Sequence, residues 1–177
     1  MTRVAVSGTH RSGKSTLIEE LSRLLPAYTV VDEPYHLMVE EGHELNHPPS
    51  LEDFEAQLER SIEELNDDKD NVLFDRCPVD FLAYISVHSD GDAFDIDKWL
   101  PRLREAVQTL DLIVFVPIEP RDRIAFAPSD DEDDSRGTVD ERLKELLLED
   151  ELDLDVEVFE VEGDLATRTR AVLRRIR

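Results

Sequence analysis

Five short apolar segments recur along the chain, and each is followed by a stretch whose apolar residues return every three or four positions. The short segments are almost continuously apolar, which indicates strands buried on both faces, and the periodic stretches predict amphipathic helices. The predicted strands cover residues 3–7, 28–33, 71–75, 111–117 and 155–161. Such strands alternating with helices predict an α/β fold, a five-stranded parallel sheet with helices on both faces.

Proline and capping residues mark the predicted boundaries. Pro34 ends the second strand, and residues 41–50 are predicted to be irregular. Ser50 is a predicted N-cap for the helix that follows, and Pro78 suits the first position of the next helix. No linker or internal repeat interrupts the alternation, so residues 1–177 are predicted to form a single domain.

Acidic residues dominate the charge of the chain. It contains 43 Asp and Glu against 20 Lys and Arg, a formal net charge of −23. This charge repels nucleic acid, so no nucleic-acid partner is expected. Whether the host is salt-loving or the protein is merely acidic stays open. A polar segment at about residues 118–138 is predicted to be a lid, and the role of its acidic run, Ser129 to Ser135, also stays open.

The cysteine content and the hydropathy pattern bear on the compartment. Cys77 is the single cysteine, so no disulfide can form within the chain, which is typical of a reducing compartment. The sequence contains no run of about 18 apolar residues and no signal-peptide pattern. We expect a soluble, cytoplasmic protein without a membrane partner, whose oligomeric state the sequence leaves open.

The segment GTHRSGKS, Gly8 to Ser15, has the phosphate-binding pattern G-x-x-x-x-G-K-[ST] directly after a predicted strand and before a predicted helix. We call this segment the P-loop. Its glycines let the backbone turn N–H groups toward an anion at the positive end of the helix. Lys14 is expected to contact the β- and γ-phosphates, Ser15 to bind Mg²⁺, and Thr16 to donate to the α-phosphate. The predicted phosphate-binding residues are Gly8, Thr9, His10, Arg11, Ser12, Gly13, Lys14, Ser15 and Thr16.

Polar residues end or follow three of the other predicted strands. Glu33 ends the second, and Asp75 ends the third with Arg76 directly after it. The arginines after the fourth are Arg121, Arg123 and Arg136. Because the carboxyl ends of parallel strands line the ligand crevice of an open sheet, we expect these residues to converge beside the P-loop.

This set of residues suits phosphoryl transfer, which depends on neutralising charge around the moving group. Asp75 is expected to hold Mg²⁺ through water. Arg76 and a lid arginine are expected to balance the charge of the γ-phosphoryl group. Either Glu33 or Asp32 is expected to accept the proton of the attacking hydroxyl.

The chain resembles the P-loop small-molecule kinases, which include deoxynucleoside kinases and thymidylate kinase, and most closely the nicotinamide riboside kinase-like group often described as AAA-type ATPase domains. The resemblance rests on the P-loop followed in order by DEP, DRCPVDFLAY, VFVPIEP and TVDERLKELL. It implies that Glu33 contacts or deprotonates the acceptor hydroxyl and that Arg76 lies near the transferred phosphate. It also implies that Arg136 or Arg123 is a lid arginine that contacts the nucleotide.

The leading interpretation is a kinase that transfers phosphate from Mg-ATP to a small, nucleoside-like acceptor. The alternative is a regulatory P-loop NTPase, either a nucleotide-driven switch or a partner-binding ATPase. A GTPase is disfavoured because the sequence has no Asn-Lys-x-Asp motif, and a complete AAA motor because one α/β domain accounts for all 177 residues. The sequence identifies neither the acceptor nor a preference for ATP over GTP.

The net charge of −23 predicts that salt stabilises the fold, because counterions screen the repulsion among carboxylates. The melting temperature should rise as salt is increased from the millimolar to the molar range in thermal unfolding followed by circular dichroism. A melting temperature that does not change over this range would contradict the salt-loving interpretation.

Overall fold

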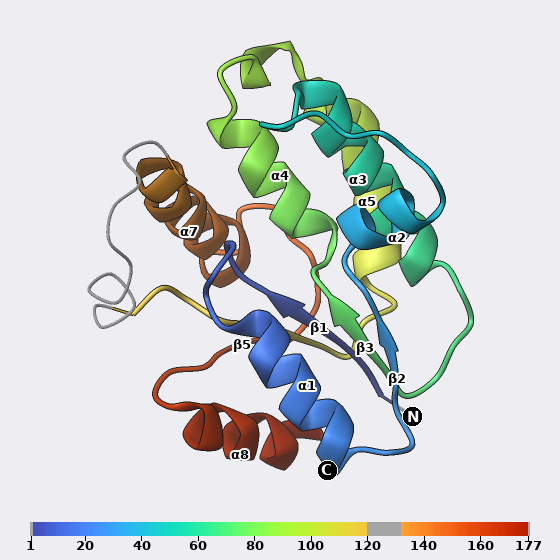
Figure 1. Cartoon of the computed structure of the whole chain (residues 1–177), viewed down its shortest axis with the longest axis vertical. Coiled ribbons are helices and arrows are strands. Elements are labelled where there is room, and N and C mark those ends of the chain that lie inside the picture. The colour runs from blue at the N-terminus through green and yellow to red at the C-terminus, as the bar shows by residue number, and fades with distance from the viewer. Residues whose placement is uncertain (1, 120–131, 177) are drawn as a thin grey trace.

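The strands form one parallel sheet in the order β2-β3-β1-β4-β5 (Figure 1). The computed structural model describes residues 2–119 and 132–176 of the chain. The strands are β1 (Arg3–Ser7), β2 (Thr29–Val31), β3 (Val72–Asp75), β4 (Leu112–Phe115) and β5 (Val158–Glu160). The predicted α/β fold with a five-stranded parallel sheet is therefore confirmed. Strands β2, β4 and β5 are shorter than predicted, with 3, 4 and 3 residues.

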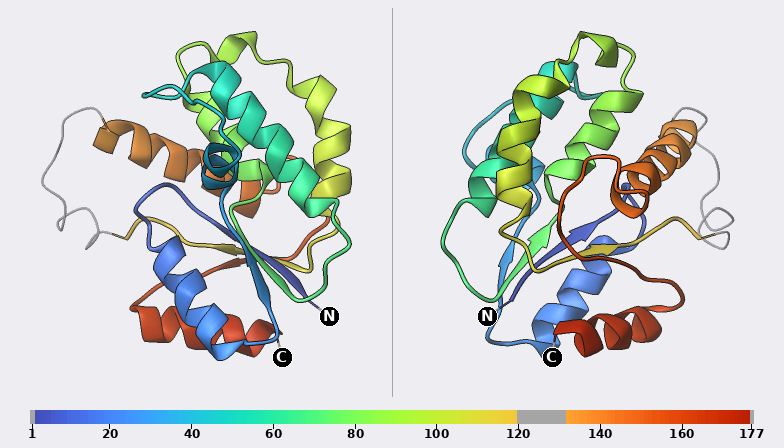
Figure 2. Two further views of the ribbon diagram at one scale, coloured as in Figure 1. Left: turned by 45° about the vertical axis from the view of Figure 1, so that its right-hand side comes forward. Right: turned by 180° about the vertical axis from the view of Figure 1, so that it is seen from behind.

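Helices cover both faces of the sheet (Figures 1 and 2). They are α1 (Lys14–Leu24), α2 (Pro34–Glu40), α3 (Leu51–Leu65), α4 (Pro78–Val87), the 3₁₀ helix η1 (Gly91–Ala93), α5 (Ile96–Val107), α7 (Glu132–Leu148) and α8 (Leu165–Ile176). Helices α1 and α8 pack together on one face, and α3, α4, α5 and α7 lie on the other. Over residues 2–119 and 132–176, no helix has the length and apolar character needed to cross a membrane.

Alternate residues of the central strands enter two separate cores. Val4 and Val6 of β1 pack in the core beneath α1 and α8, whereas Ala5 between them packs in the core beneath α3, α4, α5 and α7. Strand β4 repeats the pattern, with Val114 in the first core and Ile113 in the second. Burial on both faces explains why the strand sequences are continuously apolar rather than alternating.

The caps predicted for α3 and α4 hold these helices in place. Ser50 caps α3, where its hydroxyl accepts from the Asp53 N–H at 3.2 Å and its own N–H donates to Asp53 Oδ2 at 2.8 Å. Pro78 occupies the first turn of α4, as predicted, because its missing N–H is not needed there. Both helices thereby begin at fixed points near the carboxyl end of the sheet.

Helix α2 was not predicted by the sequence pattern. Pro34, expected only to end a strand, is also the first residue of this helix, and Glu33 is its N-cap residue with extended backbone angles. The helix has seven residues and buries only Pro34 and Met38, so it lacks a clear apolar period. Its start nevertheless fixes the backbone of Glu33 at the end of β2.

The predicted lid segment is partly helical. Residues 132–138, expected to belong to an irregular lid, form the first turns of α7. Arg121, Arg123 and residues 129–131 of the acidic run lie outside the described residues. The structure therefore places one of the three candidate arginines, Arg136, and it places it on a helix.

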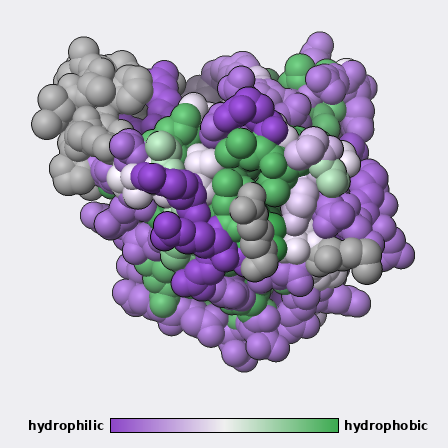
Figure 3. Space-filling model, turned by 90° about the horizontal axis from the view of Figure 1, so that it is seen from below, coloured by the Kyte–Doolittle hydropathy of each residue, from purple (hydrophilic) through white to green (hydrophobic). Residues whose placement is uncertain are grey.

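The surface reflects the high content of charged residues, which make up 36% of the chain. Hydrophilic residues cover most of the face that lies below in Figure 1, around an apolar area near its centre (Figure 3). The large apolar side chains that are clearly exposed among the described residues are Leu24, Val30, Val39, Leu148 and Leu165. This is the distribution expected of a sheet whose two apolar faces are both covered by helices.

The central position of β4 predicts a large effect of truncating Ile113, which is fully buried. Ile113→Ala should reduce the free energy of unfolding by about 2–5 kcal/mol, since the neighbouring helices fill the resulting cavity only in part. Val30→Ala, on the edge strand β2 and 38% exposed, is the control and should cost less than about 1 kcal/mol. Urea unfolding measures both, and equal losses would contradict the assigned core.

Candidate active site

The P-loop joins the central strand β1 to α1 at the carboxyl end of the sheet. A Cβ atom at Gly8 would lie 2.6 Å from the carbonyl oxygen of Val116 and 2.7 Å from Ser12 Oγ, so only glycine fits there. Gly13 has a φ of 95°, in the left-handed region that favours glycine. The two glycines that define the motif are thus required by the backbone itself.

The first two carbonyl groups of the P-loop accept hydrogen bonds from cations. Arg76 donates through Nη1 to the carbonyl oxygen of Gly8 at 2.9 Å. Lys14, only 5% exposed, donates through Nζ to the carbonyl oxygen of Thr9 at 2.9 Å. Both cations belong to the predicted site, and both are engaged with the loop backbone.

Two further arginines bind the next three carbonyl groups. Arg136 of α7 donates through Nε to the carbonyl of His10 at 3.0 Å and through Nη2 to that of Arg11 at 2.8 Å. Arg168 of α8 donates through Nη1 to the carbonyl of Ser12 at 3.1 Å. Five consecutive P-loop carbonyls therefore face cationic side chains.

Backbone N–H groups at the start of α1 are available to an anion. In the part of the chain that the structure describes, the N–H groups of Gly13, Lys14 and Ser15 have no hydrogen-bond acceptor. The first N–H groups of a helix lack partners within the helix, and they lie at the positive end of its dipole. This is the geometry in which helix N-termini bind phosphate.

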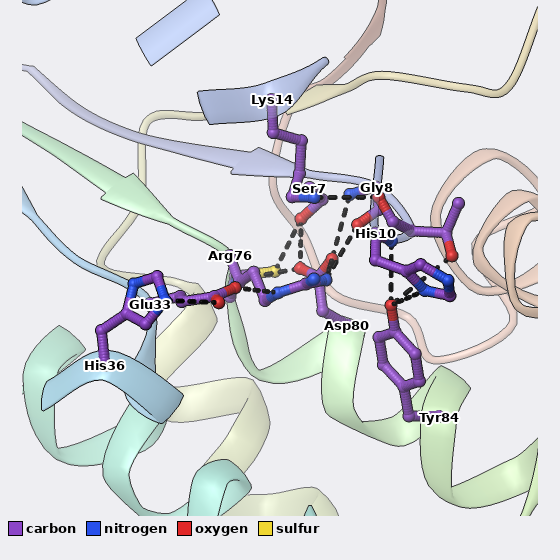
Figure 4. A network of polar contacts seen from close by, with 11 residues as sticks. Ser7, Gly8, His10, Lys14, Glu33, His36, Arg76, Asp80 and Tyr84 are labelled. Atoms are coloured by element: carbon purple, nitrogen blue, oxygen red, sulfur yellow. Dashed lines mark hydrogen bonds and ion pairs between the residues drawn. The ribbon is translucent and has the colours of Figure 1, made fainter. Parts of the chain in front are cut away.

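Helix α4 holds the first half of the P-loop from the other side (Figure 4). Asp80 is fully buried and accepts from the Gly8 N–H at 3.0 Å and from Ser7 Oγ at 2.7 Å. One helical turn later, the Tyr84 hydroxyl accepts from the His10 N–H at 3.0 Å. These bonds fix the loop where it leaves β1 and leave the later N–H groups for a ligand.

Glu33 and Arg76 form an ion pair beside the P-loop, with Oε2 and Nε 2.7 Å apart (Figure 4). They follow β2 and β3, which are neighbours in the sheet, so the expected convergence of these strand ends is observed. Burial alone would raise the pKa of Glu33, but the Arg76 charge and hydrogen bond outweigh it, and the pKa is lowered. Glu33 is therefore a carboxylate at neutral pH.

Lys14 and Asp75 lie close to this pair and are also buried. Burial, together with the charge of Arg76, lowers the pKa of Lys14 to about 8. Burial raises the pKa of Asp75, although the charges of Lys14 and Arg76 oppose this shift. Each group would regain its charged form more readily beside a ligand of opposite charge.

Ser15 and Asp75 fit the expected magnesium site. Ser15 lies in the first turn of α1, and Asp75 is paired in register with Val6, two residues before the P-loop. The Oδ1 atom of Asp75 is buried without a hydrogen-bond partner among the described residues. Mg²⁺ in proteins usually takes one or two side-chain ligands together with phosphate oxygens and water. Ser15 and Asp75 can supply the side-chain ligands.

A cavity of about 840 Å³ opens next to the P-loop, within the usual size range of small-molecule sites. His10 of the P-loop and the Glu33–Arg76 pair line it, together with Phe54 and Gln57 of α3. Tyr35 of α2 and three residues of the irregular segment before α3 also line it: His47, Pro48 and Pro49. The candidate catalytic groups therefore face a cavity whose wall also contains apolar side chains.

Stacked rings form one wall of this cavity. Phe54 and Tyr84 stack with ring centres 5.4 Å apart and planes at 13°, and His88 meets the edge of Phe54. The Arg76 guanidinium lies 5.3 Å from the centre of the Tyr84 ring. Aromatic faces suit a planar, apolar part of a ligand.

His10 of the P-loop also lines this cavity. Burial is the main cause that lowers its pKa to about 4, and the charges of nearby cations, Arg76 first, act in the same direction. The His10 ring is therefore neutral at physiological pH.

The structure brings together most of the residues predicted for the site. Lys14, Glu33 and Asp75 lie around the P-loop with Arg76 and Arg136. Asp32, the alternative to Glu33 as a proton acceptor, is exposed and does not line the large cavity. Arg123 lies outside the described residues.

Sequence reasoning missed several residues that shape the site: Phe54, Asp80, Tyr84, Glu119 and Arg168. The role of Asp80 could have been predicted from the sequence, since acidic residues are common capping residues in the first turn of a helix, here the helix that Pro78 opens. The role of Arg168 could not, because it lies in an arginine-rich helix far from the P-loop in sequence. Only the packing of α8 against α1 reveals its contact.

Comparison with known families and curated proteins gives one match and one negative result. A family model described as "AAA domain" matches residues 3–168. Comparison with the curated proteins gives no match. The family match includes all five strands and ends in the first turn of α8.

Several solved structures share the fold. Deoxyadenosine kinase from M. mycoides with bound dATP is 18% identical, with a TM-score of 0.70 and coverage of 99% of both chains. NadR protein in complex with NR is 18% identical, with a TM-score of 0.69, covering 99% of this chain and 50% of that one. Shikimate kinase from Aquifex aeolicus is 15% identical, with a TM-score of 0.60 and coverage of 99% and 96%. The predicted resemblance to P-loop small-molecule kinases is confirmed at the level of the fold.

The pKa of Lys14 predicts that ATP binding takes up protons at mildly alkaline pH. With a pKa of about 8 in the free protein, Lys14 is about half neutral at pH 8, and bound phosphates should return it to the charged form. Binding at pH 8 should therefore take up about half a proton, and almost none at pH 6, where Lys14 is already charged.

Titration calorimetry in buffers of different ionisation enthalpy measures this uptake. Lys14→Arg is the matched control, because arginine stays charged throughout this range and should take up no proton. An uptake at pH 8 that is equal in the wild type and in Lys14→Arg would contradict the assignment of the proton to Lys14.

Proposed function

The chain belongs to the AAA domain family that matches residues 3–168, and from this premise we propose that it is a P-loop kinase. It transfers the γ-phosphoryl group of Mg-ATP to a hydroxyl group of a small, nucleoside-like acceptor. The observation that carries the proposal is a cavity lined both by His10 of the P-loop and by the Glu33–Arg76 pair. The P-loop and a carboxylate base thus border one space large enough for a second substrate.

The shape and chemistry of the cavity support a nucleoside-like acceptor. The stacked Phe54 and Tyr84 rings offer an aromatic wall, and Gln57, which also lines the cavity, adds a polar amide. Glu33 and Arg76 provide the polar end, as a sugar hydroxyl requires. The fold is shared with a deoxyadenosine kinase and with NadR bound to NR, which agrees with this assignment.

Phosphoryl transfer assigns a role to each of these groups. The acceptor oxygen forms a bond to the γ-phosphorus, the bond from that phosphorus to the oxygen bridging it to the β-phosphate breaks, and ADP leaves. Glu33, ionised and facing the cavity, takes the proton of the acceptor hydroxyl. Arg76 and Lys14 balance the charge of the phosphoryl group.

Ser15 and Asp75 hold Mg²⁺ in this proposal. When bound, the metal neutralises charge on the β- and γ-phosphates. Asp75 is suited to this position because it is buried and its Oδ1 has no hydrogen-bond partner among the described residues, so a cation would relieve the cost of burying it. Ser15 contributes its hydroxyl from the first turn of α1.

Replacing Glu33 tests the proposed base. Glu33→Gln keeps an oxygen that can accept from Arg76 but removes the basic carboxylate, so transfer to the best acceptor should fall by about 10²-fold or more. The affinity for Mg-ATP should stay within about twofold, because Glu33 faces the acceptor. Asp32→Asn is the matched control, an exposed acid at the end of the same strand, and it should keep full activity.

The measurement is transfer of labelled γ-phosphate to a panel of nucleosides and vitamin ribosides. Equal activity of Glu33→Gln and Asp32→Asn would remove the role given to Glu33. If ATP yields only free phosphate with every acceptor, the regulatory NTPase becomes the better account of the site.

A further inference from the structure

Arg168 joins the last helix of the fold to the P-loop. It is 6% exposed and lies on α8, which covers the sheet face opposite α3, α4, α5 and α7. Its Nη1 donates to the carbonyl oxygen of Ser12 at 3.1 Å, and its Nη2 lies 3.1 Å from Glu119 Oε1. The same carboxylate oxygen accepts from the N–H of Gly163 in the loop before α8. A buried guanidinium is thus held between an acid and the backbone of the P-loop.

The peptide group between Ser12 and Gly13 links this contact to the ligand side of the loop. In a planar trans peptide, the C=O and N–H groups point in opposite directions. Because Arg168 binds the Ser12 carbonyl, the Gly13 N–H is turned away from α8. That N–H has no acceptor among the described residues, like those of Lys14 and Ser15 that follow.

The close approach of Arg168 also depends on Gly13. A Cβ atom at this position would lie 3.0 Å from Arg168 Nη1, which is tighter than an ordinary contact. The guanidinium therefore packs directly against the loop backbone where the helix begins. Glycine at this position serves the left-handed turn and also leaves space for the arginine.

We propose that Arg168 is a positioning residue of the nucleotide site. It fixes the Ser12–Gly13 peptide so that the Gly13 N–H points at the phosphates, and Glu119 fixes Arg168 in turn. The inference rests on the proposed function, since it requires polyphosphate in the P-loop. Arg168 should affect the binding of the phosphate groups and not that of the acceptor, because Arg168 does not line the cavity.

A buried arginine that only stabilised the fold would behave differently. Its loss would lower the melting temperature of the free protein, but it would not selectively weaken a ligand of the P-loop. A positioning role predicts weaker binding of every ligand that uses the Gly13 N–H. Inorganic tripolyphosphate is a suitable probe, because it carries the phosphates and lacks the base and sugar.

Titration of tripolyphosphate and of Mg-ATP into Arg168→Ala tests the proposal. Both ligands should bind about tenfold more weakly than to the wild type, equivalent to about 1.4 kcal/mol. Arg174→Ala is the matched control, since Arg174 is an exposed arginine on the same helix, and it should bind as the wild type does. The KM for the acceptor should change by less than twofold in both variants.

Two milder variants keep the test decisive if Arg168→Ala folds poorly. Arg168→Lys keeps the charge but has one donor group to share between Ser12 and Glu119, so it should recover part of the affinity. Glu119→Gln keeps the oxygen that accepts from Arg168 and removes the charge, so binding should weaken by about threefold.

The outcomes separate this inference from the proposed kinase activity. Unchanged affinity for tripolyphosphate in folded Arg168→Ala, or equal losses in Arg174→Ala, overturns the positioning role. A wild type that binds ATP but phosphorylates no acceptor overturns the kinase proposal and still allows the affinities to be compared. A wild type that binds neither ligand overturns both.

Discussion

A P-loop can present its N–H groups to an anion only if its carbonyl groups find partners on the opposite side. Buried backbone oxygens without partners cost free energy, and Gly8, Thr9 and Ser12 of this loop are buried. Here Lys14, Arg76, Arg136 and Arg168 bind five consecutive carbonyls. These cations come from α1, the end of β3, α7 and α8, so the sheet and both helical layers converge on the loop.

The same arrangement explains how so many charges are buried together. A buried cation without partners would be costly, whereas one that is paired and hydrogen-bonded is tolerated. Arg76 contacts Glu33 and lies within 3.5 Å of Asp80, and its other donor meets the loop backbone. Asp80 in turn accepts from the start of the P-loop. The carboxylates that hold the arginine therefore also hold the loop that it binds.

The elements and the P-loop were predictable because they depend on local pattern. Continuous apolar runs predict buried strands, and the spacing of Gly8, Gly13 and Lys14 predicts a phosphate site wherever it joins a strand to a helix. Helix α2 was not predictable, since it buries only Pro34 and Met38. Arg168 was equally hidden, because its partner Ser12 is 156 positions away along the chain. Contacts of this kind follow from tertiary packing rather than from local sequence.

The two ends of the site differ in how much of the fold they involve. The phosphate end is held by both helical layers and by the central strand, so its geometry is tied to the stability of the whole sheet. The proposed acceptor end is walled mainly by α3, α4 and the irregular segment before α3. Changes at Phe54 or Gln57 can therefore alter what the cavity accepts without moving the P-loop. A deoxyadenosine kinase and a shikimate kinase share this fold, and a phosphate end held apart from the acceptor end would allow one fold to serve different acceptors.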